Sequence, residues 1–76
     1  MRIRWTPAAA ADLEQISEYL KQRLIELAQR RLPVMRVREE GTRELVFSPL
    51  PYIAVYRLKG PSIEVLRIYH GARNVS

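Results

Sequence analysis

The second half of the chain contains three runs of strand-forming residues separated by two turn sequences. Residues 43–48 (RELVFS) alternate in polarity, residues 52–58 (YIAVYRL) are apolar on both faces, and residues 63–69 form the last run. Proline and glycine in residues 48–51 and 59–62 resist continued strand pairing. The pattern therefore predicts a three-stranded antiparallel β-meander with the apolar run as its central strand.

Alternation along the last run predicts which of its side chains share a face of the sheet. It places Ile63, Val65, Arg67 and Tyr69 on one face, and Leu66, Ile68 and His70 on the other. Neighbouring Tyr69 and His70 therefore point in opposite directions.

The N-terminal third predicts a short strand followed by a helix. Residues 2–5 (RIRW) alternate as in a half-buried strand, and Thr6-Pro7 is typical of a helix start. A helical stripe of apolar residues follows, formed by Leu13, Ile16, Leu20, Leu24 and Leu27.

No Gly, Pro or Asn lies between Pro7 and Pro33, so the local signals favour one long helix over a two-helix hairpin, which stays as the alternative. The order of elements indicates an α+β domain with the helix packed on one sheet face.

A single helix of this length, roughly 35 Å, would be longer than strands of about 17–24 Å. Apolar residues near its end, such as Leu24, Leu27 and Leu32, would then extend past the sheet. We expect another chain to cover them, either a second copy forming a homo-oligomer or an inhibitor protein. Leu20, Leu24 and Leu27 are the predicted contact residues.

Composition limits the chain to a single domain over residues 1–76 and excludes several kinds of site. It has no cysteine and one histidine, so neither a disulfide nor a structural zinc site is expected, and no cofactor is indicated. No apolar stretch resembles a signal peptide or a membrane-spanning helix, so we expect a cytoplasmic protein without membrane contact.

The chain is basic and its positive charge comes mostly from arginine. The formal net charge is +5, and arginine suits bidentate pairing with carboxylate or phosphate. Arg57 and Arg67 lie within apolar strands, where an unpaired charge is costly. Each must pair inside the protein, for example with Glu44 or Glu64, or contact a partner, and both interpretations stay open.

Three residues at the end of the last strand could form a catalytic set on paper. A ribonuclease needs a general base, a general acid and a cation, and Tyr69, His70 and Arg73 have suitable chemistry. Their alternation on the strand separates Tyr69 from His70, however. This favours a structural role for His70.

Several short motifs occur in the order found in one toxin family. They are Trp5-Thr6-Pro7, Pro51-Tyr52 with Tyr56-Arg57, and His70-Gly71-Ala72-Arg73. With them, residues 1–20 and the sequence from Glu39 onward resemble the ParE branch of the RelE/ParE toxins. Family members usually carry a second helix and a loop between Lys21 and Glu39, so this chain resembles a member with a shortened helical region.

The resemblance implies the toxin of a type II toxin–antitoxin (plasmid stabilisation) system, neutralised by a ParD-like antitoxin whose acidic and apolar tail wraps the basic sheet and helix. The ParE branch inhibits DNA gyrase without enzymatic activity, and direct nucleic-acid binding is not expected. Arg57 matches that branch's central-strand arginine, while Arg67, His70 and Arg73 match its C-terminal pattern, so we expect all four to contact partners.

Two alternatives remain open. The RelE branch cleaves mRNA on the ribosome, and an endoribonuclease here would use Tyr69, His70, Arg57 and Arg73. Residues 43–48 lack the lysines of that branch, which leaves its usual set incomplete. The chain could also be a degenerate, non-toxic remnant that still binds an antitoxin.

Overall fold

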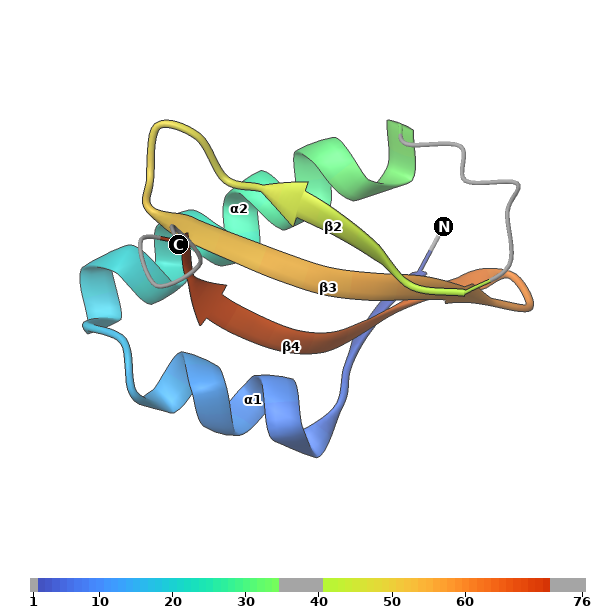
Figure 1. Cartoon of the computed structure of the whole chain (residues 1–76), viewed down its shortest axis with the longest axis horizontal. Helices are drawn as coiled ribbons and strands as arrows, with labels where there is room; N and C mark the ends of the chain where they lie inside the picture. Colours follow the sequence, from blue (N-terminus) through green and yellow to red (C-terminus); the bar gives the residue numbers. More distant parts are fainter. Residues whose placement is uncertain (1, 35–40, 72–76) are drawn as a thin grey trace.

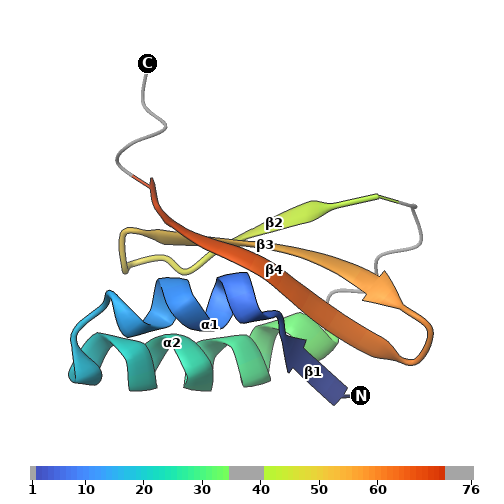
Figure 2. The same cartoon turned by 90° about the horizontal axis from the view of Figure 1, so that it is seen from below.

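Two helices cover one face of a four-stranded sheet in this computed structural model, which describes residues 2–34 and 41–71 (Figures 1 and 2). The elements, in chain order, are β1 (Arg2–Trp5), α1 (Pro7–Glu14), α2 (Glu18–Arg31), the short 3-10 helix η1 (Leu32–Val34), β2 (Arg43–Val46), β3 (Tyr52–Lys59) and β4 (Ser62–His70). The α+β class is confirmed. No helix within the described residues is long and apolar enough to cross a membrane.

The sheet is mixed, with the strand order β1-β4-β3-β2. β3 pairs antiparallel with both β2 and β4, which confirms the meander. β1 pairs parallel with the first half of β4, so that Ile3 lies opposite Ile63 and Trp5 opposite Val65. The second half of β4 therefore extends beyond β1 as a sheet edge.

The predicted start of the first helix is confirmed. The Thr6 side-chain oxygen accepts a hydrogen bond from the Ala9 backbone N–H at 3.1 Å, and Pro7 occupies the first turn, where its missing N–H costs nothing.

The prediction of one long helix is wrong, and the hairpin is what the structure contains. The chain leaves the helical path after Glu14, and the Ile16 N–H donates to the Leu13 carbonyl at 3.0 Å. Ser17 then caps α2, its hydroxyl accepting from the Leu20 N–H at 3.4 Å. A serine cap can thus start a second helix after a turn that contains no glycine or proline. The apolar stripe continues across this break between α1 and α2, so it gave no sign of the turn.

The helical hairpin removes the predicted overhang. Because α2 folds back along α1 beneath the sheet, Leu24 and Leu32 have 0% of their surface exposed (Figure 2). Leu24 is thus part of the protein's own core and is not available to a partner, while Leu20 and Leu27 are partly buried. The argument for a homo-oligomer rested on that overhang and loses its support.

A β-bulge in β4 changes the predicted faces of its second half. Val55 lies opposite Arg67 while Tyr56 lies opposite Val65, so Leu66 is the extra residue. Ile68 is consequently buried on the helix side with Val65, and Arg67 turns to the opposite side. The predicted grouping of Val65 with Arg67 and Tyr69 is wrong, because strict alternation assumes that the strand contains no extra residue.

Candidate partner-binding surface

One face of the sheet has no helix across it within the described residues (Figure 2). We call it the outer face. Strand pairing places the following side chains on it in cross-strand register: Arg2 and Arg4 of β1, Glu44 and Val46 of β2, Ile53, Val55, Arg57 and Lys59 of β3, and Ser62, Glu64, Arg67 and Tyr69 of β4.

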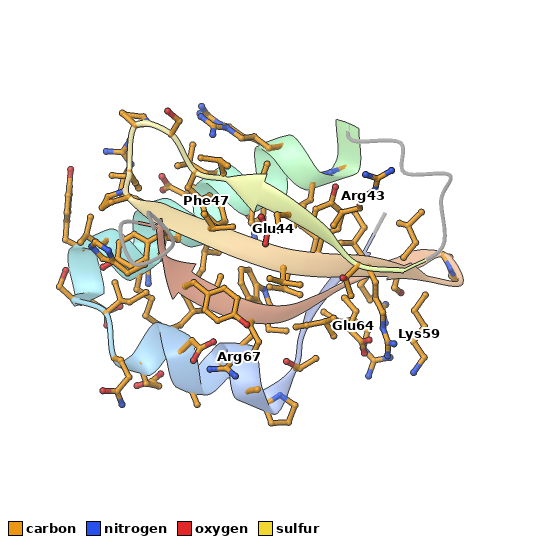
Figure 3. The ribbon with its side chains drawn as sticks, viewed as in Figure 1. Arg43, Glu44, Phe47, Lys59, Glu64 and Arg67 are labelled. Atoms are coloured by element: carbon orange, nitrogen blue, oxygen red, sulfur yellow. The ribbon has the colours of Figure 1, made fainter. Side chains whose placement is uncertain are left out.

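Arg67 extends beside α1 (Figure 3). It joins the outer face to that helix through an ion pair with Asp12. Its Nε donates to Asp12 Oδ2 at 2.8 Å and its Nη2 donates to Oδ1 at 3.1 Å, the bidentate geometry that arginine favours. The guanidinium carbon also lies 5.6 Å from the centre of the Tyr69 ring, within cation–π range. Arg67 is thus held by internal partners although it is half exposed.

Asp12 also forms a hydrogen bond to the second half of β4, which β1 does not cover. Its Oδ2 accepts a hydrogen bond from the Ile68 backbone N–H at 2.8 Å, and Thr6 donates its hydroxyl to the Leu66 carbonyl at 3.0 Å. The Arg67 hydrogen bonds hold the pKa of the Asp12 carboxyl below its ordinary value, against the opposing effect of partial burial. The same pairing raises the pKa of Arg67.

Arg57 forms the second ion pair of the outer face. Its Nε donates to Glu64 Oε1 at 2.8 Å, which confirms that an internal pair with Glu64 is one of its roles. The Arg57 hydrogen bond lowers the pKa of Glu64, and the charges of Lys59 and Arg4 lower it further. Glu64 therefore lies among several cations at the end of the sheet near the β3–β4 turn.

His70 and Tyr69 point to opposite sides of β4, as alternation predicts at this position. The His70 ring meets the Tyr52 ring edge-on, with centroids 5.2 Å apart and an interplanar angle of 75°. Both line an open pocket of about 230 Å³ between α1 and the sheet, together with Asp12, Gln15, Ile16 and Ile68. His70 thus contacts β3 through Tyr52 while its side chain is exposed, and its role stays a prediction. Arg73 lies outside the described residues.

Apolar side chains also reach solvent on the outer face. Val46, Ile53 and Tyr69 form one row across β2, β3 and β4, with Val46 55% and Tyr69 41% exposed. Sequence reasoning missed Val46 and Asp12 as functional candidates. For Val46 the sequence showed only that it lies in an alternating strand, and Asp12 looked like any acidic residue near a helix start.

Within the described residues, no group of three or more potential ligands could hold a metal ion.

Comparison with known proteins agrees with this architecture. Residues 3–75 match the family model described as the ParE toxin of the type II toxin–antitoxin system parDE. The solved chromosomal ParDE system from P. aeruginosa contains a similar chain, with a TM-score of 0.74 and 26% identity, covering 92% of this chain and 95% of that one. The toxin–antitoxin complex RelBE2 from Mycobacterium tuberculosis gives a TM-score of 0.73 at 24% identity, covering 91% and 88%, which shows the shared fold alone. No curated protein sequence matches significantly.

The helical hairpin on a mixed sheet and the match over nearly the whole chain define the class, which is the toxin of a type II toxin–antitoxin system. Within that class, the chain belongs to the ParE toxin family. Its α2 occupies most of the region where the sequence led us to expect a shortened helical segment.

Proposed function

We propose that this toxin inhibits bacterial DNA gyrase by binding it in the cytoplasm, and that a cognate ParD-like antitoxin neutralises it. The family match supports the toxin role, and the similar solved chains come from toxin–antitoxin systems.

The observation that carries a binding mechanism is the separation of Tyr69 from His70. An acid and a base that cleave RNA must both reach one reacting phosphate. Here Tyr69 lies on the outer face beside Arg67, whereas His70 packs against Tyr52 on the helix side. This arrangement supports recognition of a protein over cleavage of RNA.

The outer face is suited to the predicted partner contacts. Arg57 and Arg67 present partly exposed guanidinium groups beside the exposed Val46 and Tyr69 side chains. A partner segment that is both acidic and apolar complements this mixture, which is the composition expected of the antitoxin tail. We propose that such a partner covers the outer face and continues around the end of β4 to His70, which lies on the helix side.

Expression of the chain in bacteria tests the proposal. Gyrase inhibition should produce DNA breaks and an SOS response with intact mRNA, and co-expression of the antitoxin encoded next to the toxin gene should restore growth. The paired variant Arg57→Gln with Arg67→Gln should reduce toxicity, whereas Arg23→Gln with Arg30→Gln on α2 removes the same charge elsewhere and should not. Growth arrest without DNA breaks would contradict gyrase as the target.

A second candidate, ribosome-dependent mRNA cleavage, is favoured by one observation. Arg57, Arg67 and Tyr69 share the outer face, so an RNA strand there would meet two cations and a phenol. Cut mRNA that disappears in the variant Tyr69→Phe would support this function. If the chain neither arrests growth nor damages DNA or mRNA, yet binds the antitoxin, it is a non-toxic remnant.

A further inference from the structure

Four cations lie on the outer face at the end of the sheet near the β3–β4 turn, and we call them the four-cation patch. In β1, Arg2 and Arg4 alternate with Ile3 and Trp5, which pack against the core, so both arginines point outward. Arg57 and Lys59 extend from β3 on the same face. All four residues are exposed.

Strand register arranges the patch in two rows across β1, β4 and β3. Arg4, Glu64 and Arg57 form one row, and Arg2, Ser62 and Lys59 form the other. Rows two residues apart are separated by about 6.6–6.8 Å along the strands. Because β4 lies between β1 and β3, the two columns of cations are roughly 9.5 Å apart.

The charges of the patch are only partly compensated inside the protein. Glu64 is the single carboxylate within these rows, and it uses one oxygen to accept from Arg57 Nε at 2.8 Å. Figure 3 shows Glu64 and Lys59 at this end of the sheet. The Arg57 hydrogen bond lowers the pKa of Glu64, and the nearby charges of Arg57, Lys59 and Arg4 lower it further. Among the described residues, these rows hold four positive side chains and one negative one, an excess of three positive charges that a ligand could meet.

We propose that the four-cation patch binds an extended acidic peptide with carboxylates at every second residue. Side chains on one face of an extended peptide repeat at about the same 6.6–6.8 Å as the cations along β1 and β3, so successive carboxylates meet successive cations. An open hollow lined by Gly41, Thr42, Arg57, Leu58 and Lys59 adjoins the patch and can receive a neighbouring side chain of the peptide.

The surroundings of the patch favour a peptide over a nucleic acid. Its two rows contain no aromatic side chain on which a base could stack. Glu64 and Ser62 lie between the cations, and a peptide backbone carries N–H donors for such oxygens, whereas the phosphate groups of a nucleic acid only accept. The inference rests on the proposed function only in that a partner protein supplies the peptide.

Fluorescence anisotropy with the full chain tests the inference. The probe is a labelled threonine-based peptide with glutamate at every second position. The comparison ligands are a peptide of the same composition with glutamate at every third position and a single-stranded DNA of matched charge. We expect the alternating peptide to bind most tightly, and we expect its affinity to fall with added salt.

The variant Arg4→Gln with Lys59→Gln should weaken binding of the alternating peptide about tenfold, by the usual strength of exposed ion pairs. Arg23→Gln with Arg30→Gln, which removes two charges from α2, should change it less than about twofold. If the first pair unfolds the protein, Arg2→Gln alone should give a loss of about threefold.

Equal weakening by both paired variants, equal binding of the two peptides, or tighter binding of the DNA would overturn the inference. Growth arrest and antitoxin rescue, which test the proposed function, do not enter this measurement. The peptide site and the toxin function can therefore fail independently.

Discussion

At the scale of single residues, Asp12 connects α1 to the edge of β4 because one carboxylate accepts from both Arg67 and the Ile68 N–H. Asp12→Asn removes the charge from this junction, so we expect it to lower the free energy of unfolding by about 1–2 kcal/mol. Urea unfolding at neutral pH measures the change. Glu14→Gln removes only the exposed pair with Lys21 and should cost less than about 0.5 kcal/mol. Equal small losses would contradict a special role for Asp12.

The two lowered carboxyl pKa values predict a loss of stability in acid. Arginine hydrogen bonds hold the pKa of Asp12 and Glu64 below their ordinary values of 3.8 and 4.5. As pH falls, these two carboxyls therefore take up protons in the unfolded chain before they do so in the folded protein. The stabilisation is complete above the ordinary pKa values, and it is lost as pH falls below them through the lower pKa values of the folded protein. Urea midpoints measured down this pH range should fall, and less steeply in Asp12→Asn. Parallel curves for the two proteins would show that Asp12 does not contribute.

At the scale of elements, Thr6 serves a helix and a strand at once. Its hydroxyl oxygen caps α1 and its hydrogen goes to the Leu66 carbonyl at the bulge. Thr6→Val loses both bonds and should cost about 2 kcal/mol, whereas Thr6→Ser should cost less than about 1 kcal/mol. Ser17→Ala removes a cap with a single role and gives the reference value in the same unfolding experiment. Equal effects of Thr6→Val and Thr6→Ser would exclude the hydrogen bonds as the cause.

A side chain of α2 occupies part of the hydrogen-bonding edge of β2. The Arg31 guanidinium donates to the Val46 carbonyl at 3.2 Å and to the Ser48 carbonyl at 2.9 Å. An unpaired strand edge is a template for another chain. We expect Arg31→Ala to increase concentration-dependent self-association in light scattering, and Arg30→Ala, one residue away on α2, to leave it unchanged. Identical scattering by the two variants would mean that Arg31 does not protect this edge.

Local patterns predicted the elements better than their connections. The four strands and the Thr6-Pro7 helix start were readable because alternation and capping depend on neighbouring residues. The parallel pairing of β1 with β4 joins residues about sixty positions apart, and a strand's own sequence does not specify its partner. The break before Ser17 and the bulge at Leu66 contain no glycine or proline, so turn-forming residues in the sequence could not reveal either feature.

At the scale of the whole molecule, the sequence predicted the family and included, as one open alternative, one of the two ion pairs that the described residues form on the outer face. The toxin family, inferred from short motifs, is confirmed by the match over residues 3–75. The Arg57–Glu64 pair was one of two sequence alternatives. The Arg67–Asp12 pair was not predicted, because 55 residues separate its members and only the fold brings α1 beside β4. Gyrase as the target stays a prediction.

The most direct test of the account is a reaction in which the purified full chain is added to bacterial DNA gyrase and plasmid, alongside a ribosome and mRNA reaction. We predict that supercoiling stops and cleaved plasmid accumulates while the mRNA stays intact, and that the antitoxin reverses the effect. Cut mRNA with gyrase fully active would contradict a toxin that acts by binding gyrase.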